Sequence, residues 1–426
     1  MATYKEYINK IESGAYDERL VDVYADPSLL AYQKTRYVDA IRHFVELFGV
    51  EEVAVYSAPG RSEVSGNHTD HQRGHVLAAS INLDAVGIVS KTEDNIVHLV
   101  SGDAEPIHIA LDHVNVIEEE KGTTAALIRG VAAGLHSAGY AIGGANIYVV
   151  SDVLMGSGMS SSAAFECLMG TIMSGLYNEM KVPPVEIAKI GQYAENVYFG
   201  KPCGLMDQMA CSVGGLIHVN FERPEDPETE KLEFDLNAYD YSLCITDTKG
   251  SHANLTDEYA AIPEEMRSIA EYFKKDVLLE ICVEDIYNNM GELRKLAGDR
   301  AVLRALHFIG ENERVQNEVE AIKAGNIARL FELIKESGNS SYKFLQNIYS
   351  NKDVRSQNVS LALAVSELVL GNHGVCRVHG GGFAGTIQAF VENAAVYDYQ
   401  KRMDGMFGEN ACRVLKIRKY GGIKVL

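Results

Sequence analysis

The sequence predicts an α+β protein with two domains, and two observations support this prediction. The chain has 426 residues, of which 46% are hydrophobic, and this is enough for two or three domains of about 150 residues with real cores. Short apolar stretches of strand length dominate the first half, whereas long stretches with helical spacing dominate the second half. Strands and helices that are grouped in separate parts of a chain are typical of α+β folds.

Composition and charge exclude several classes of protein. The 39 Lys and Arg residues against 59 Asp and Glu residues give a net charge of −20, so the surface should repel nucleic acid. No stretch approaches the roughly 20 uncharged apolar residues of a membrane helix, and the start of the chain lacks the apolar core of a signal peptide. The seven cysteines are scattered without CxxC spacing, which favours reduced thiols over disulfides or a zinc site. We therefore expect a cytoplasmic protein without nucleic-acid or membrane partners.

The first half is expected to form a helix followed by a sheet. Apolar residues recur at helical spacing over 32–48 and end at Gly49, a usual helix stop. A strand at 53–58 follows, and the segment 58–74 (APGRSEVSGNHTDHQRG) is too polar for a core, so we expect a loop there. The remaining elements of this half are strands at 76–81, 85–90, 97–100, 107–110 and 146–151 and helices at 124–139 and 163–180.

The second half is expected to be mainly helical around a few strands. A helical region rich in Glu and Lys runs from about 256 to 350, and another helix covers 360–371. Strands are predicted at 241–248, 386–391 and 412–417.

One boundary between domains is predicted. The acidic, proline-containing segment 222–231 follows a strand and is typical of an exposed connection. We therefore place the boundary near residue 220, which gives domains 1–220 and 221–426. An extension over residues 1–45 could pack on the fold or form a partner surface.

A loop rich in glycine and serine opens the helix at 163–180. Its backbone N–H groups and hydroxyls can bind one anion, and the helix dipole adds to that attraction. Glycine lets a phosphate approach closely, and a serine hydroxyl can also bind Mg²⁺, so the loop suits a nucleoside triphosphate. It lacks the lysine of a Walker A loop, and a solvent-exposed turn with a serine N-cap is the alternative. The candidate residues are Gly156, Ser157, Gly158, Ser160, Ser161 and Ser162.

Three other segments contain candidate site residues. Segment 58–71 supplies donors, acceptors and one cation for a polyhydroxylated ligand, although such strings are usually polar surface loops. Asp207 is a lone acid in an otherwise apolar stretch, so its carboxylate should be paired or functional. The glycines at 380–382 either make a tight turn or let the backbone approach a ligand closely. The candidates in segment 58–71 are Arg61, Asn67, His68, Thr69, Asp70 and His71.

These segments, in this order, resemble the motifs of the GHMP kinase superfamily, and within it those of the galactokinases. Galactokinase motifs read approximately GRVNLIGEHTDY, GxGLSSSAA, AExxFVG, CGIMDQ, SEYxxRR and TGGGFGG. The counterparts here are GRSEVSGNHTDH at 60–71, GSGMSSSAA at 156–164, AENVYFG at 194–200, CGLMDQ at 203–208, DEY at 257–259 and HGGGFAG at 379–385. The resemblance covers roughly residues 45 to 420. It implies a two-domain GHMP kinase fold with mixed sheets, helices on one face and an active-site cleft between the domains that holds ATP, Mg²⁺ and a sugar.

The resemblance also implies roles for individual residues. Asp207 matches the acid of the CGxMDQ motif and becomes the catalytic acid/base candidate, with Arg61 beside it and the γ-phosphate. Ser162 and Glu195 match the residues that hold Mg²⁺, next to the phosphate loop. The sugar contacts would fall to Asn67, His68, Asp70, Gly204 and Tyr259. The implied reaction is ATP-dependent phosphorylation of the anomeric hydroxyl of galactose, and we expect a monomer or small homo-oligomer.

The sugar side departs from the family pattern, and this leaves alternatives open. Asn67 replaces the family's glutamate and His71 replaces its tyrosine. A carboxylate about 4 Å from a substrate carboxylate would cost roughly 4 kcal/mol at an effective dielectric near 20. An amide there makes a hexuronic acid such as galacturonate a rival to galactose, and His71 could add positive charge. A sensor that binds galactose and ATP without turnover is a further alternative, but the presence of Ser162, Glu195 and Asp207 favours an enzyme.

Overall fold

The chain folds into two compact units, and each unit is built from segments that are not continuous in the sequence. The computed structural model describes residues 2–153, 158–250 and 255–426. The first unit contains residues up to 61, residues 80–215 and residues 416–426, and the second contains residues 62–79 and 216–415. The long strands β2 (Glu52–Ser65) and β3 (His75–Lys91) therefore contribute to both units. This division differs from the single boundary predicted near residue 220, because local patterns show where strands occur but not with which segments they pack.

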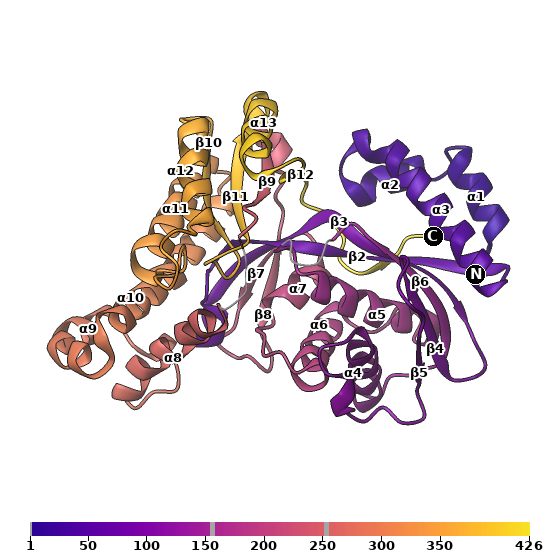
Figure 1. Cartoon of the computed structure of the whole chain (residues 1–426), viewed down its shortest axis with the longest axis horizontal. Helices are drawn as coiled ribbons and strands as arrows, with labels where there is room; N and C mark the ends of the chain where they lie inside the picture. Colours follow the sequence, from indigo (N-terminus) through magenta and orange to yellow (C-terminus); the bar gives the residue numbers. More distant parts are fainter. Residues whose placement is uncertain (1, 154–157, 251–254) are drawn as a thin grey trace. The chain divides into compact units, whose positions relative to one another are not determined.

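A mixed sheet forms the centre of the first unit, and helices cover both of its faces (Figure 1). Besides its parts of β2 and β3, the unit contains β1 (Ala2–Thr3), β4 (Ile96–Ser101), β5 (Ile107–Ala110), β6 (Ala145–Ser151), β13 (Ile423–Lys424), α1 (Tyr4–Glu12), α2 (Asp17–Tyr24), α3 (Leu30–Phe48), α4 (Thr124–Ser137), α5 (Ser161–Tyr177), α6 (Pro184–Tyr193), a π-helix (Ala194–Phe199) and α7 (Met206–Val213). Strand order is β1-β2-β3-β6-β4-β5, with β4 and β6 parallel and β3 and β6 antiparallel. Side chains alternate along β3: Gly87 faces α5, whereas Val86 and Ile88 pack in the core under α1–α3.

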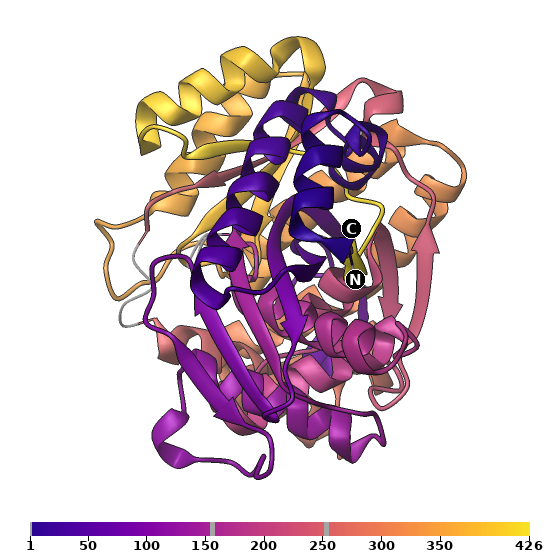
Figure 2. The ribbon, with the colours of Figure 1, turned by 90° about the vertical axis from the view of Figure 1, so that its right-hand side faces the viewer.

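The N-terminal helices are part of this fold. Asp84 of β3 is fully buried and accepts hydrogen bonds from Arg36 of α3 at 2.7 Å, Arg418 at 2.9 Å and Tyr24 of α2 at 2.9 Å. Burial raises the pKa of Asp84, but the two guanidinium groups lower it more, so the net pKa is below its ordinary value. Because an unpaired buried charge is very costly, this cluster joins the helices and the C-terminal segment to the sheet. The two chain ends lie side by side along β2 (Figure 2).

The second unit is built on an antiparallel sheet with the strand order β10-β11-β9-β12. Its elements are β7 (Leu216–Asn220), β8 (Glu228–Leu232), β9 (Tyr241–Asp247), β10 (Gly374–His379), β11 (Thr386–Glu392), β12 (Cys412–Leu415), α8 (Thr256–Tyr272), α9 (Val283–Asn288), α10 (Met290–Lys323), α11 (Ile327–Ser340), α12 (Asn358–Leu370) and α13 (Val396–Phe407). Helices α11 and α12 pack on β10, and β7 pairs with the start of β3. The long helical region predicted from about 256 to 350 is confirmed as α8 to α11. Of the helices formed by the described residues, none has the length and apolar character needed to cross a membrane.

The loop predicted for segment 58–74 is wrong in its first part. Strand β2 continues through Ser65, and Ser62, Glu63 and Ser65 are 0%, 4% and 0% exposed. The chain leaves the strand only at Gly66, which has a φ of 92°, and a 3₁₀ turn follows at Asp70–Gln72. The polarity of this segment misled the prediction because its side chains find hydrogen-bonding partners in distant parts of the second unit, and paired polar groups can be buried.

Candidate active site

Asp207 and Arg61 form a two-point ion pair in the first unit. Asp207 lies in the first turn of α7 with its side chain 32% exposed, whereas the Arg61 side chain is 8% exposed. Arg61 Nε lies 2.6 Å from Oδ1 of Asp207, and Nη2 lies 3.0 Å from Oδ2. The remaining nitrogen, Nη1, donates to the carbonyl oxygen of Gly158 at 2.5 Å. Bidentate pairs of this kind fix orientation as well as charge, so one arginine joins the candidate base to the phosphate loop.

A close backbone contact holds the phosphate loop against β2. The N–H of Arg61 donates to the carbonyl oxygen of Met159 at 3.2 Å. A Cβ on Gly60 would lie 2.9 Å from that same oxygen, closer than side chains tolerate. Glycine at this position therefore allows the strand and the loop to meet.

Ser160 connects the phosphate loop to Asp207. Ser160 has a φ of 57°, in the left-handed region, and stands at the N-terminus of α5. Its hydroxyl donates to Oδ2 of Asp207. Ser161 and Ser162 occupy the first turn of α5, where free N–H groups and the helix dipole favour anions. Gly156 and Ser157, which were also predicted for this loop, lie outside the described residues.

The pairing with Arg61 keeps Asp207 ionised. Burial raises the pKa of Asp207, but the charge and hydrogen bonds of Arg61, the hydroxyl of Ser160 and the charge of Lys201 lower it more. The net pKa is below its ordinary value. A carboxylate with a lowered pKa is a weak base, so this side chain can orient a hydroxyl group more readily than it can deprotonate it.

Ser162 and Glu195, the predicted magnesium ligands, lie in direct contact. The Ser162 hydroxyl donates to Oε1 of Glu195 at 3.1 Å, and Lys201 Nζ donates to the same oxygen at 2.9 Å. The carboxylate is only 3% exposed and belongs to the π-helix after α6. A hydroxyl and a carboxylate oxygen are hard donors that Mg²⁺ prefers, and Mg²⁺ commonly takes its other ligands from phosphate and water. The residues present therefore fit this ion.

Glu166 is a buried acid next to Glu195 that the sequence reasoning did not single out. Gln208 Nε2 donates to Oε2 of Glu195 at 2.9 Å and to Oε2 of Glu166 at 3.0 Å. Glu166 is fully buried on α5, and its Oε1 has no hydrogen-bond partner among the residues that the structure describes. Burial and then the charge of Glu195 raise the pKa of Glu166 well above its ordinary value, which favours the neutral form of this side chain. The signal was available, because Glu166 is a lone acid in an apolar helix, as Asp207 is in its own segment.

The predicted sugar residues are shared between the two units. Gly204 is an exposed residue just before α7 in the first unit, whereas Asn67, His68, Asp70 and Tyr259 belong to the second unit. His68 Nε2 donates to the carbonyl oxygen of Gly381 at 3.2 Å, and the Tyr259 hydroxyl donates to that of Gly382 at 2.8 Å. Oδ1 of Asp70 accepts from the N–H of His71 at 2.9 Å. In the second unit, the structure therefore brings His68 and Tyr259 to the three-glycine segment.

Neither His68 nor His71 adds positive charge at neutral pH. Burial lowers the pKa of His68 to about 4. Burial, followed by the neighbouring His68, lowers the pKa of His71 to about 3. The expectation that His71 could supply a cation for a uronate carboxylate is therefore wrong.

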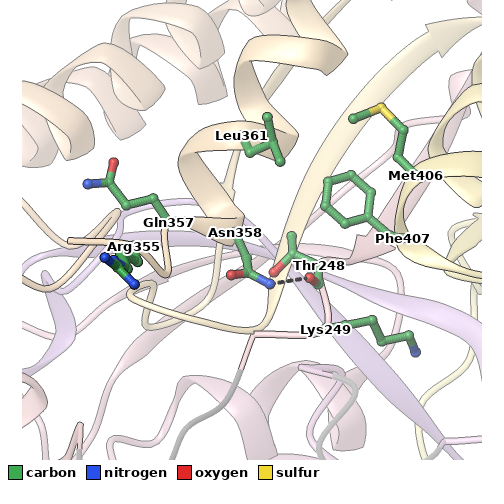
Figure 3. Close-up of a pocket in the computed structure, with 8 residues that line it drawn as sticks. All are labelled: Thr248, Lys249, Arg355, Gln357, Asn358, Leu361, Met406 and Phe407. Atoms are coloured by element: carbon green, nitrogen blue, oxygen red, sulfur yellow. Dashed lines mark hydrogen bonds between the residues drawn. The ribbon is translucent and has the colours of Figure 1, made fainter. Parts of the chain in front are cut away.

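A separate pocket lies elsewhere in the second unit (Figure 3). Its volume is about 390 Å³, and Asn358 Nδ2 donates to the carbonyl oxygen of Thr248 at 2.9 Å in its wall. The lining residues are Thr248, Lys249, Arg355, Gln357, Asn358, Leu361, Met406 and Phe407. None of the predicted site residues lines this pocket, so we do not assign it to the reaction.

Comparisons with known proteins show which family the chain resembles. Residues 126–215 match the family of GHMP kinases N terminal domain, and residues 42–91 match the galactokinase galactose-binding signature. A galactokinase of Streptomyces coelicolor is 30% identical over 387 residues, which are 90% of this chain and 97% of that protein. A galactokinase of Lactobacillus helveticus is 30% identical over 83% of this chain and 89% of that protein.

Solved structures show the same relationship. The crystal structure of Lactococcus lactis galactokinase complexed with galactose has a TM-score of 0.76 and 26% identity over 90% of this chain and 98% of that chain. A mevalonate kinase shares the fold with a TM-score of 0.60 and 16% identity over 86% of this chain and 99% of that chain. The α+β fold and the match to the N-terminal domain of GHMP kinases thus define a GHMP kinase. Within that class, the chain belongs to the galactokinase family, which confirms the resemblance found in the sequence.

Proposed function

We propose that the protein transfers the γ-phosphate of ATP to the anomeric hydroxyl of galactose, giving galactose 1-phosphate. The observation that carries this proposal is the position of Arg61, which binds both oxygens of Asp207 and the carbonyl of Gly158 in the phosphate loop. A candidate base, a fixed cation and a phosphate cradle therefore lie within one hydrogen-bonded group. Membership of the galactokinase family supports the choice of reaction.

In the proposed reaction, Arg61 acts on the phosphoryl group that is transferred, whereas Asp207 acts on the sugar hydroxyl that receives it. Phosphoryl transfer passes through a loose transition state, so alignment and positive charge around the moving phosphoryl group matter most. Arg61 supplies fixed charge, and the N–H groups at the start of α5 add to it. Asp207 accepts a hydrogen bond from the sugar hydroxyl and takes its proton late, because its lowered pKa makes it a weak base.

Ser162 and Glu195 would hold Mg²⁺ with the nucleotide. The ion supplies charge stabilisation to the phosphate oxygens. Lys201 neutralises Glu195 in the structure described here, with Nζ 2.9 Å from Oε1. Gln208 fixes the other oxygen of Glu195, which orients the carboxylate toward Ser162.

Galactose is the proposed sugar, and galacturonate is the second candidate. Asn67 replaces the family's glutamate, but the Glu63 carboxylate lies 2.9 Å from its Nδ2. His68 and His71 are neutral and offer no cation to attract a uronate. Steady-state kinetics with both sugars, together with NMR of the product to locate its phosphate, test the proposal. A higher kcat/KM for galacturonate, or a phosphate away from C1, would overturn it.

A sugar sensor is the alternative from another class. The contacts among the predicted site residues favour turnover. Ser162 donates to Glu195, and Arg61 contacts both Asp207 and Gly158 of the phosphate loop. Release of ADP that depends on sugar, measured with purified protein, separates the two functions, since a sensor releases none with any sugar of a panel. We further propose that the enzyme works in the cytoplasm as a monomer or small homo-oligomer. Light scattering of the purified protein tests the oligomeric state.

A further inference from the structure

Side chains hold every carbonyl group of the three-glycine segment 380–382, which we call the glycine loop. Asn67 Nδ2 donates to the oxygen of Gly380 at 2.7 Å. Asn347 Nδ2 donates to that of Gly381 at 3.1 Å, where His68 also donates, and Tyr259 donates to that of Gly382. All of these residues belong to the second unit. The shape of the glycine loop is therefore set by side-chain donors.

The amide of Asn67 can have only one orientation. Its Nδ2 faces the Glu63 carboxylate at 2.9 Å and the Gly380 carbonyl, and both groups can only accept. Its Oδ1 accepts from Asn347 at 2.7 Å and from Ser341 at 3.3 Å. Asn67 is fully buried, and its hydrogen-bonding capacity is taken up by the protein itself.

The residue types at positions 63 and 67 are swapped relative to the galactokinase motif, and this makes the arrangement possible. The galactokinase motif GRVNLIGEHTDY has an amide at its fourth position and a carboxylate at its eighth, whereas this chain has Glu63 and Asn67 in those places. An ionised glutamate at position 67 could not donate to the Gly380 carbonyl. Glu63 is buried beside the guanidinium of Arg377, with Nη2 3.4 Å from Oε1. The positive charge of Arg377 therefore compensates the negative charge of Glu63.

We propose that Asn67 is a positioning residue of the kinase, which fixes the glycine loop through Gly380 while Glu63 fixes Asn67. In a trans peptide the carbonyl and the next N–H point in opposite directions. Holding the carbonyls of Gly380 and Gly381 therefore turns the N–H groups of Gly381 and Gly382 away from the buried side chains. Asn67 thus sets the direction of the backbone donors of the glycine loop.

The position of the glycine loop allows little adjustment. A Cβ on Gly382 would overlap the backbone oxygen of Asn347, and a Cβ on Gly381 would lie 2.9 Å from the ring of Tyr259. Because His68 and Tyr259 also donate to this loop, a change at Asn67 would shift two of the proposed sugar contacts. The inference rests on the proposed kinase function, but the loop itself can be observed without activity.

The test compares Asn67→Asp, the double variant Glu63→Gln with Asn67→Asp, and Ser62→Ala as a matched control. The substitution Asn67→Asp removes the amide donors and places a second carboxylate against Glu63, so the single variant should lose thermal stability. In the double variant the new amide at position 63 can donate to the new carboxylate at position 67, and stability should return. In the double variant, the Gly380 carbonyl still lacks the hydrogen bond that Asn67 donates in the wild type. Ser62 is equally buried and bonds Gln388 at 3.2 Å, away from the glycine loop.

Two readouts at pH 8 decide the outcome. We expect faster amide hydrogen exchange in the peptide 379–386 in both variants that carry Asn67→Asp, and not in Ser62→Ala. We also expect kcat/KM for the sugar to fall roughly 10²-fold in both, the size of effect that a displacement of about 1 Å can have. Return of loop protection and activity together with stability in the double variant would overturn the proposal, as would an unchanged Asn67→Asp. Wild-type protein that phosphorylates no sugar would instead refute the proposed function, and hydrogen exchange would still test the loop.

Discussion

The guanidinium group of Arg61 binds both carboxylate oxygens of Asp207, at 2.6 and 3.0 Å. This pair accounts for the ionised state of Asp207, since Arg61 is the strongest of the groups that lower its pKa against the effect of burial. The same arginine reaches Gly158, so a change in either residue affects both the candidate base and the phosphate loop. Substitution of each residue in turn tests the role of the pair.

Asp207→Asn should reduce turnover roughly 10²- to 10⁴-fold, the usual contribution of a positioned base, while sugar affinity stays nearly unchanged. The amide keeps the size of the side chain and can still accept from Ser160, so the fold should be retained. Steady-state kinetics and calorimetric sugar binding measure the two effects separately. Full turnover in this variant would remove Asp207 from the mechanism.

Arg61→Lys should move the acid limb of the pH–rate profile to higher pH. A lysine is a single point charge and cannot reproduce the two-point contact with Asp207. With less stabilisation of the carboxylate, the pKa of Asp207 rises toward or above its ordinary value, so the protonated, inactive form appears at a higher pH. The measurement is kcat/KM against pH for both proteins. Superimposable profiles would show that Arg61 does not control the ionisation of the group that limits the rate.

The sequence predicted the phosphate loop, Asp207 and the long helices because each depends on local features. A glycine and serine run before an apolar helix and a lone acid among apolar residues are visible within one short window. The end of β2 could not be predicted in this way, because Ser62 bonds Gln388 and Glu63 bonds Arg377, more than 300 positions away. Polar side chains that are paired at such distances look like a surface loop when only their neighbours in the chain are considered.

Glu166→Gln should leave activity close to that of the wild type, whereas Glu195→Gln should not. Burial and the charge of Glu195 raise the pKa of Glu166 well above its ordinary value and so favour its neutral form, and a glutamine can still accept from Gln208. Glu195 is a proposed Mg²⁺ ligand, and its amide should raise the Mg²⁺ concentration needed for half-maximal activity by at least roughly 10- to 100-fold, the effect that outer-shell changes alone can have. Magnesium titrations of the two variants form a matched pair. Equal Mg²⁺ requirements in both would contradict the assignment of Glu195.

Glu318→Gln should stabilise the protein increasingly as the pH rises from about 4.5 to about 8. Glu311 and Glu318 are fully buried and share the hydroxyl of Ser65, at 3.3 and 3.0 Å. Burial, followed by the charge of Glu311, raises the pKa of Glu318 from 4.5 to about 8. Between these two values the unfolded chain releases this proton and the folded chain keeps it, so wild-type stability falls as the pH increases. Glutamine does not titrate and removes this penalty, while it keeps an oxygen that accepts from Ser65. Thermal melting at pH 5 and pH 8 measures the effect, and a gain in stability that is equal at both pH values would show that Glu318 is ionised in the folded protein.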